Sequence, residues 1–227
     1  MRQLKKGLVV VAFSFLLTTH DPRLTVAFGA PTLVDDFEGE EIHNRLGARA
    51  NVYVKSPSRI MMSRTSEVIK GKKSQALLLR YDKKAEGGPY NLGGWCGYYT
   101  LLKSPGYLVA PTPEDPNPDP VGEQYLDGGA LKNVTFWVRG ETGSENFAVG
   151  LADRHWDQVG DSVKSEEIGK YLPAGRLTTE WQKATIPLDT FFVDYSKLAS
   201  ISVCFEADVL PDGKGTGTVY IDDILLE

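Results

Sequence analysis

The chain has 227 residues, of which 41% are hydrophobic and 24% are charged, a balance typical of a soluble globular protein. This length fits one large all-β domain or two small domains. The formal net charge of −5 gives no electrostatic reason to expect a nucleic-acid partner, because proteins that bind nucleic acids concentrate positive charge.

Residues 1–29 have the features of a secretory signal peptide. The basic start MRQLKK precedes a short apolar run at 7–17, which is too short to span a bilayer with ease. A small-x-small cleavage site is present at Ala27-Phe28-Gly29. We therefore predict a secreted or periplasmic protein whose mature chain, residues 30–227, has no membrane span. The alternative is an uncleaved anchor helix.

Short β-rich runs recur through the mature chain and are separated by clusters of Gly, Pro and Asp. Such runs predict an all-β sandwich or barrel, and with neither a repeat nor a second apolar core we predict one domain. Helical periodicity is weak, and short surface helices are predicted only at 162–172 and 188–198. The predicted strands are 33–37, 51–55, 75–81, 95–102, 131–139, 146–152, 182–188, 201–207 and 218–226.

The segment 104–123 contains six prolines with acidic residues between them. Proline lacks a backbone donor, so this segment is predicted to be an extended loop rather than a strand. It would form either a lip over a binding face or a solvated insertion.

Two cysteines, Cys96 and Cys204, lie in predicted strands. In an oxidising compartment they could form one disulfide. The alternative is that both pack as buried free thiols.

Four segments follow one another along the chain in the order LVDDFEG, YLDGGALKNVTFWVRGETGSENFAVGLAD, EWQKATIPLDTF and VYIDDILLE. This order resembles that of jelly-roll carbohydrate-binding modules. The resemblance covers roughly residues 33–227 and is closest to family 11 modules and the related complex I intermediate-associated, galactose-binding-like family. It implies a two-sheet antiparallel β-sandwich, glycan binding on the concave sheet and often a structural calcium.

Sugar binding needs flat aromatic faces for the apolar side of a pyranose and polar groups for its hydroxyls. The aromatic stretch 95–99, the DRHWD segment at 153–157 and two polar strand ends offer this mixture. For the aromatic residues the alternative is a core position, and for DRHWD it is a hydrogen-bonded connecting loop. The predicted ligand-binding residues are Trp95, Tyr98, Tyr99, Arg139, Asp153, Arg154, His155, Trp156 and Glu206.

Carboxylates gather in the first and last predicted strands, which would be neighbours in a jelly roll of this kind. Neither LVDDFEGE nor VYIDDILLE contains Lys, Arg or His, so their pooled carboxylates would repel one another. A Ca²⁺ ion would resolve this repulsion, because it takes six to eight oxygen ligands. We predict Asp36, Glu38 and Asp222 as side-chain ligands of a structural Ca²⁺, with Asp223 as a hydrogen-bonded partner outside the ligand set, although Asp222 and Asp223 could exchange these roles. The alternative is that hydroxyls, backbone amides or a distant arginine satisfy these acids.

The chain lacks the Gly-x-Ser-x-Gly, His-Glu-x-x-His and Cys-x-x-Cys motifs, so it is not predicted to be an enzyme. We predict a non-catalytic secreted module that binds a β-glucan-like polysaccharide. One alternative is a cell-envelope interaction or structural protein that has lost glycan binding and has an envelope protein partner. A small glycan-active enzyme, which needs only two suitably placed carboxylates, is less favoured.

Overall fold

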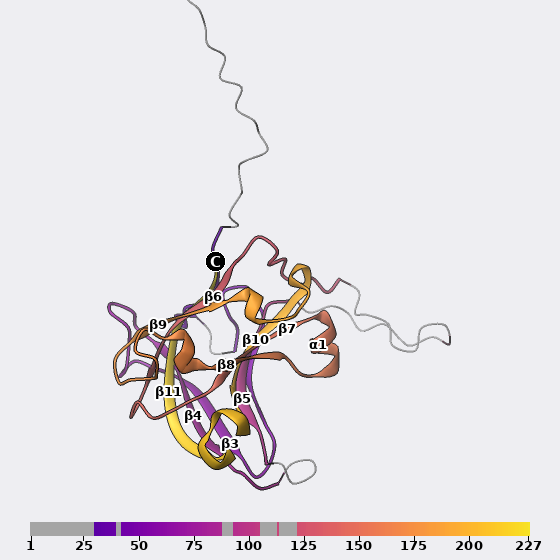
Figure 1. Cartoon of the computed structure of the whole chain (residues 1–227). Helices are drawn as coiled ribbons and strands as arrows, with labels where there is room; N and C mark the ends of the chain where they lie inside the picture. The colour runs from indigo at the N-terminus through magenta and orange to yellow at the C-terminus, as the bar shows by residue number, and fades with distance from the viewer. Residues whose placement is uncertain (1–29, 40–41, 88–92, 105–112, 114–121) are drawn as a thin grey trace, which may run out of the picture.

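The structure is a computed structural model that describes residues 30–39, 42–87, 93–104, 113 and 122–227. These residues form two antiparallel β-sheets and few helices, which confirms the predicted two-sheet β-sandwich (Figure 1). In this part of the chain, no helix is both long and apolar enough to span a membrane. The predicted signal peptide and most of the predicted proline-rich loop lie outside the described residues.

The larger sheet has the strand order β3-β4-β11-β6-β9, and β1 also pairs with β11. The first and last strands are therefore antiparallel neighbours, as the sequence predicts. The strands of this sheet are β1 (Thr32–Asp35), β3 (Arg59–Thr65), β4 (Ala76–Lys83), β6 (Asn133–Gly140), β9 (Gln182–Pro187) and β11 (Gly215–Leu226).

The smaller sheet has the strand order β2-β5-β10-β7-β8. The helix α1 (Arg154–Val159) follows β7 directly and lies at the edge of the molecule beside this sheet (Figure 1). The strands of the smaller sheet are β2 (Ala50–Val54), β5 (Cys96–Leu101), β7 (Ala148–Asp153), β8 (Val163–Glu167) and β10 (Leu198–Phe205).

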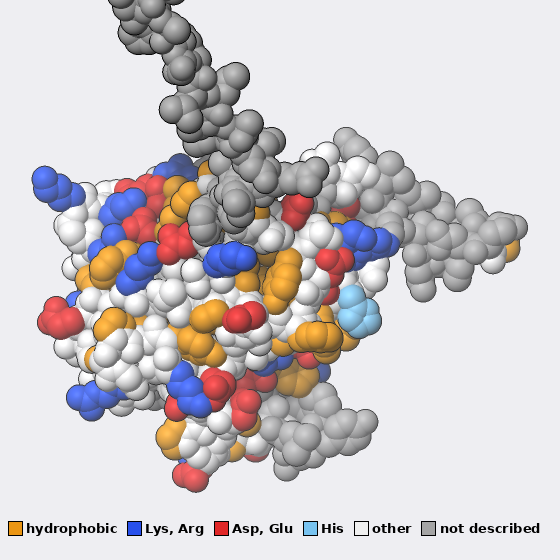
Figure 2. Space-filling model, turned by 45° about the horizontal axis from the view of Figure 1, so that its top comes forward, with side chains coloured by type: hydrophobic (Ala, Val, Ile, Leu, Met, Phe, Trp, Pro, Cys, Tyr) orange, Lys and Arg blue, Asp and Glu red, His pale blue; other side chains and the backbone are white. Residues whose placement is uncertain are grey.

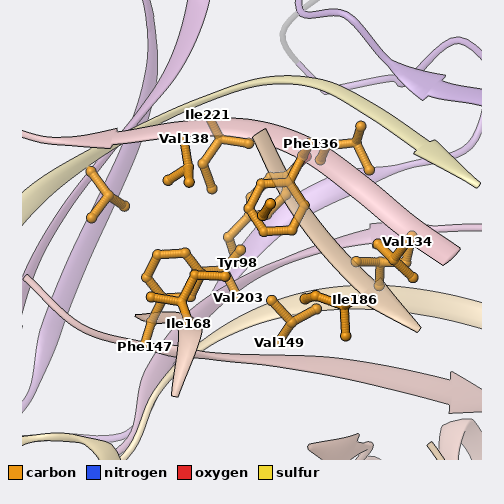
Figure 3. Packing of buried hydrophobic residues seen from close by; sticks show 14 of the residues in the cluster. Tyr98, Val134, Phe136, Val138, Phe147, Val149, Ile168, Ile186, Val203 and Ile221 are labelled. Carbon is orange, nitrogen blue, oxygen red and sulfur yellow. The ribbon is translucent and has the colours of Figure 1, made fainter. Parts of the chain in front are cut away.

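The hydrophobic core is built from alternate residues of strands in both sheets (Figure 3). In β6 these are Val134, Phe136 and Val138, as expected when every second side chain of a strand faces inward. The Tyr81 ring of β4 stacks on Phe205 of β10 with a centroid distance of 3.8 Å, which links the two sheets. The period-two pattern of the sequence thus becomes the packed interior.

The surface carries both signs of charge. On the face drawn in Figure 2, Lys and Arg side chains lie among Asp and Glu side chains, and hydrophobic side chains form separate patches. A surface of mixed charge does not produce the extended positive field that attracts nucleic acid.

Both predicted helices are wrong. Residues 163–167 form β8, followed by the 3₁₀ turn η3 (Ile168–Tyr171). Residues 188–198 hold two separate 3₁₀ turns, η4 (Leu188–Thr190) and η5 (Tyr195–Lys197). In residues 163–167, the pairing of β8 with β7 overrides a weak local preference for helix. Two further 3₁₀ turns, η6 (Ala207–Val209) and η7 (Pro211–Gly213), precede β11.

Cys96 and Cys204 are both buried and free. The register of β5 and β10 places Cys96 opposite Phe205 and Cys204 opposite Gly97. The two thiols therefore project from opposite faces of the sheet, since neighbouring positions in a strand alternate. Of the two alternatives that the sequence leaves open, the structure has the packed thiols.

Candidate functional site

A cavity of about 650 Å³ lies on the face of the smaller sheet that points away from the core. Its size is within the range of sites for small ligands. Tyr99 and Leu101 line it from β5, whereas the intervening strand positions face the interior. The full lining comprises Tyr53, Trp95, Tyr99, Leu101, Lys103, Asp157, Gly160, Asp161, Ser162, Lys164, Ser200, Ser202 and Glu206.

Aromatic rings line the side of the cavity that β2 and β5 form. Tyr53 belongs to β2, Tyr99 to β5, and the 38%-exposed Trp95 directly precedes β5. Tyr53 lies over Gly97, because a Cβ added at Gly97 would come within 2.3 Å of the Tyr53 hydroxyl oxygen. The hydroxyl also contacts the Cys204 thiol, and burial raises the pKa of Tyr53. The ring is therefore a fixed, uncharged platform.

Charged side chains line the opposite side, which is formed by β8 and the end of β10. Lys164 Nζ lies 2.7 Å from Asp161 Oδ1 and 3.7 Å from Glu206 Oε1. Burial raises the pKa of Glu206, and the nearby Lys164 ammonium only partly offsets this effect. This side of the cavity therefore offers carboxylate acceptors and an ammonium donor within one group.

A second ionic group lies where the cavity meets α1. Lys103 Nζ donates a hydrogen bond of 2.6 Å to Asp157 Oδ2, and it also pairs with Glu123. Its ammonium lies 5.4 Å from the centroid of the Tyr125 ring. Each lysine of the lining is thus held between two carboxylates, so its geometry is set before any ligand binds.

The DRHWD segment is not the loop that the sequence predicts. Asp153 caps α1, because its Oδ1 accepts a 3.0 Å hydrogen bond from the Trp156 backbone N–H. Gly160 ends the helix with a φ of 78°, the left-handed conformation that glycine adopts readily. An aspartate before the segment and a glycine after it are helix-boundary signals that the loop prediction overlooked.

Three of the predicted ligand-binding residues, Trp95, Tyr99 and Glu206, line the cavity. The prediction for Tyr98 is wrong, because this side chain is only 2% exposed and packs in the core (Figure 3). Arg139 belongs to β6 in the other sheet, where its guanidinium lies 5.7 Å from the Tyr220 ring centroid.

The remaining predicted residues belong to α1 or to its cap and do not line the cavity. Asp153 is 6% exposed, and its second oxygen accepts a 2.7 Å hydrogen bond from the Asp194 backbone N–H. Its role is therefore to hold local structure. Arg154, His155 and Trp156 lie on the helix, and only the next residue, Asp157, contributes to the lining.

Sequence reasoning missed Tyr53, Lys103 and Lys164 as lining residues. A signal for Lys103 was available, because it continues the alternation of Tyr99 and Leu101 beyond the predicted strand. Tyr53 lies in the predicted strand 51–55, where alternation places it on the same face as the polar residues Asn51 and Lys55. Lys164 lies in the segment 162–172, for which a helix is predicted, so its position on the outer face of a strand was not predicted.

Replacing Asp153 with alanine is expected to lower the free energy of unfolding by about 1–2 kcal/mol, because the helix loses its cap and the Asp194 N–H loses its acceptor. Urea denaturation would measure the change. His155→Ala is the matched control, since His155 is exposed on the same helix and contacts the edge of the Trp156 ring. Equal stability of the two variants would contradict this role for Asp153.

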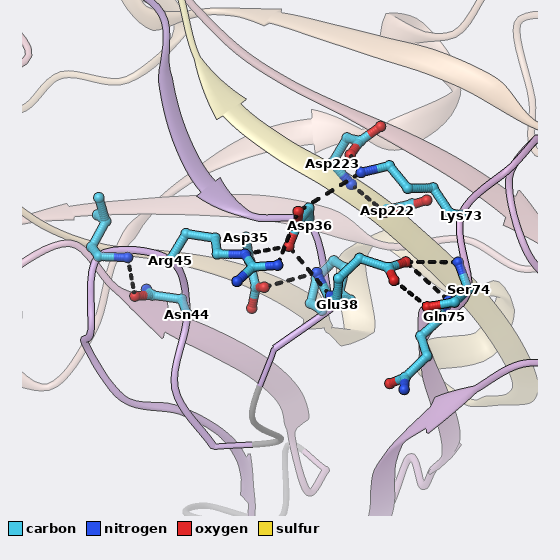
Figure 4. A network of polar contacts seen from close by, with 12 residues as sticks. Asp35, Asp36, Glu38, Asn44, Arg45, Lys73, Ser74, Gln75, Asp222 and Asp223 are labelled. Atoms are coloured by element: carbon cyan, nitrogen blue, oxygen red, sulfur yellow. Dashed lines mark hydrogen bonds and ion pairs between the residues drawn. The ribbon is translucent and has the colours of Figure 1, made fainter.

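The acids of β1 and β11 lie close together, but most of them already have partners in the protein (Figure 4). Asp36 Oδ1 accepts a 2.6 Å hydrogen bond from Arg45 Nε, and the arginine lowers the pKa of Asp36 against the opposing effect of burial. Glu38 accepts hydrogen bonds from the Ser74 and Gln75 backbone N–H groups at 2.9 and 3.0 Å. The sequence alternative that included a distant arginine describes these contacts.

Asp222 and Asp223 differ in their surroundings. Asp223 has a φ of 47° at a register shift between β11 and β6, so the strand alternation is broken there. Asp223 pairs with lysines, whereas Asp222 is fully buried. Asp222 Oδ1 accepts from the Asp223 N–H at 2.8 Å, and Oδ2 has no hydrogen-bond partner among the described residues.

The predicted calcium ligands do not converge on one point. In the part of the chain that the structure describes, no group of three or more His, Cys, Asp and Glu side chains is placed to hold a metal ion. The carboxylate oxygens of Asp36, Glu38 and Asp223 already contact arginine, backbone N–H and lysine partners, respectively. The residues as folded therefore do not fit the predicted site, and calcium binding stays a prediction.

Comparison with known proteins supports the resemblance to carbohydrate-binding modules. The family model described as carbohydrate binding domain 30 matches residues 123–227, and no curated protein matches the chain. The fold is similar to the family 11 carbohydrate-binding module of the cellulosomal cellulase Lic26A-Cel5E of Clostridium thermocellum. The TM-score is 0.54 at 14% identity, over 87% of this chain and 94% of that one.

A second similar structure is a family 11 module from Clostridium thermocellum in complex with a β-1,3-1,4-mixed-linked tetrasaccharide. Its TM-score is 0.53 at 15% identity, over 86% of this chain and 94% of that one. At these identities the likeness shows the fold. Together with the family match, it confirms the predicted resemblance to jelly-roll carbohydrate-binding modules.

Proposed function

We propose that this protein is a non-catalytic carbohydrate-binding module that holds a β-glucan-like chain against Tyr53, Trp95 and Tyr99. The observation that carries the proposal is the two-sided cavity, with aromatic rings on one side and paired charges on the other. A pyranose ring has the matching character, because its C–H face is apolar and its hydroxyls project around the rim.

The polar groups of the cavity can both accept hydrogen bonds from a sugar hydroxyl and donate hydrogen bonds to it. Asp157, Asp161 and Glu206 accept hydrogen bonds, and Lys103 and Lys164 donate them. The ligand would join ion pairs that already exist, so it would not have to neutralise a buried charge. With three carboxylates and two ammonium groups in the lining, an uncharged polysaccharide is favoured over an anionic one.

Two further observations support a glucan as the ligand class. The similar family 11 module binds a β-1,3-1,4-mixed-linked tetrasaccharide, which makes a mixed-linked β-glucan the first ligand to test. The basic and apolar pattern of residues 1–29 supports export of the protein to a secreted or periplasmic location, where it could meet an extracellular polysaccharide.

The non-catalytic reading rests on the state of the carboxylates in the cavity. Hydrolysis of a glycosidic bond needs two carboxyl groups that face each other across the sugar, about 5–10 Å apart. Here Asp157 and Asp161 are each engaged by a lysine, which suits a role in holding hydroxyls. The envelope-protein alternative predicts no glycan affinity, so the same binding experiment separates it from this proposal.

Affinity electrophoresis of the full mature chain in gels that contain mixed-linked β-glucan, hydroxyethylcellulose, xylan or mannan tests the proposal. We expect retention by the β-glucans, weak or no retention by xylan and mannan, and no release of reducing sugar from any polymer. Calorimetric titration with a mixed-linked tetrasaccharide would then give the affinity. Unretarded migration in all four gels would overturn the proposed function.

A further inference from the structure

The segment Ile69–Gln75, with the sequence IKGKKSQ, crosses the place where the first and last strands meet. We call this segment the lysine strap. Its Ile69 carbonyl accepts a 2.9 Å hydrogen bond from Trp181 Nε1, and the Lys70 ammonium lies 4.7 Å from the centroid of the Trp137 ring. Trp137 alternates with core residues in β6, so the strap covers the outer face of the larger sheet.

The lysines of the strap contact the acids of both chain ends. Lys70 Nζ lies 2.7 Å from Asp223 Oδ2, and Lys73 Nζ lies 3.1 Å from Asp223 Oδ1. Lys73 Nζ also lies 3.8 Å from Asp36 Oδ2, so it bridges the end of β1 to β11 (Figure 4). One ammonium group therefore contacts carboxylates from the start and the finish of the sandwich.

Backbone groups of the strap hold the third acid. The N–H groups of Ser74 and Gln75 donate to Glu38 Oε1, and the Ser74 hydroxyl donates to the other oxygen of Glu38. These bonds lower the pKa of Glu38, with the Ser74 hydroxyl as the largest cause. The strap thus satisfies Glu38 without any contribution from a metal ion.

The two lysines of the strap supply positive charge beside Arg45, which already pairs with Asp36. Two ammonium groups carry the same formal charge as one Ca²⁺. Burial acts to lower the pKa of Lys73, but the hydrogen bond to Asp223 and the charges of the nearby aspartates together outweigh it, and the pKa is raised. The side chains of Lys70 and Asp223 are only 23% and 17% exposed, so salt screens this pair less than a pair on the open surface.

We propose that the lysine strap is the built-in counter-charge of the chain ends, in the place where the sequence predicts calcium. Lys70 and Lys73 neutralise Asp223, Lys73 also reaches Asp36 beside Arg45, and the folded chain keeps its stability without the ion. The proposal concerns how the two ends of the chain are held together, and it does not depend on whether the protein binds a glycan.

Thermal unfolding of the full mature chain tests the proposal in two arms. In the first arm, the Tm of the wild-type protein is measured in excess chelator and in millimolar calcium chloride. We expect the same Tm under both conditions. A protein stabilised by a bound ion would gain stability from added calcium by mass action. A Tm that falls with chelator and recovers with calcium would overturn the proposal.

In the second arm, the variant Lys70→Met/Lys73→Met is compared with Lys72→Met. We expect the double variant to melt about 4–8 °C lower than wild type, and Lys72→Met to melt within about 1 °C of wild type, because Lys72 is an exposed lysine of the same strap. Equal melting of the double variant and Lys72→Met would also overturn the proposal. If the double variant does not fold, the single variant Lys73→Met and the chelator arm provide the test.

Discussion

Replacing Tyr53 with alanine is expected to weaken binding of a mixed-linked β-glucan tetrasaccharide by about 30-fold, which corresponds to roughly 2 kcal/mol. The reason is the loss of a fixed aromatic face. The Tyr53 ring rests on Gly97 and its hydroxyl contacts Cys204, so little conformational entropy is lost when a sugar stacks on it. Calorimetric titration measures the affinity directly.

Two control variants separate stacking from other effects of this change. Tyr53→Phe keeps the ring and is expected to retain affinity within about threefold. Trp156→Ala removes an aromatic residue of α1 that does not line the cavity, and its affinity should stay at the wild-type value. If Tyr53→Ala bound as tightly as Trp156→Ala, the aromatic side of the cavity would not be the sugar platform.

Asp222→Asn is expected to stabilise the protein at pH 8 by on the order of 2–3 kcal/mol. Burial, assisted by the neighbouring Asp223, raises the pKa of Asp222 from its ordinary value of 3.8 to about 6. The folded state therefore holds this proton more tightly than the unfolded state does. Stability conferred by the protonated group is complete below about pH 4 and is lost as the pH rises through about 6.

The asparagine variant should show its gain only where the carboxyl group would be ionised. Asparagine keeps the oxygen that accepts a hydrogen bond from the Asp223 N–H. It removes the negative charge of a buried carboxylate, whose Oδ2 has no hydrogen-bond partner in the described structure. Urea denaturation at pH 8 and at pH 3.5 measures both ends of the range, and no difference from wild type is expected at pH 3.5. A less stable variant at pH 8 would contradict the assignment.

Asp223→Asn is the matched comparison, because the two aspartates are adjacent and have opposite surroundings. Asp223 is partly exposed and pairs with Lys70 and Lys73. Removal of its charge should lower stability at pH 8, since two ammonium groups lose a common partner. The same conservative change at neighbouring positions should thus act in opposite directions.

The two sheets of the sandwich have different roles in the proposed function and in the stability of the fold. The outward positions of β2, β5, β8 and β10 in the smaller sheet line the cavity that we propose binds sugar. The larger sheet joins the two ends of the chain through β1 and β11 and is crossed by the lysine strap. A change in the strap should therefore alter the melting temperature and leave the sugar platform in place.

Local pattern alone determined most of the strands and the class of fold. Alternation of apolar and polar residues in segments such as 131–139 and 218–226 reflects the two faces of a strand, and this information is contained in neighbouring residues. The resemblance carried by the four ordered segments predicted two sheets with the first and last strands as neighbours, and the structure confirms it.

Only the tertiary structure decided which side chains meet. Tyr53, Tyr99 and Lys164 come from three separate strands, and their meeting depends on strand order and register, which local sequence does not encode. Lys70 and Lys73 lie far in the sequence from both acidic segments, so the local pattern of those segments does not reveal their lysine partners. Short-range pattern fixes which face a residue takes, whereas long-range pairing selects its partner.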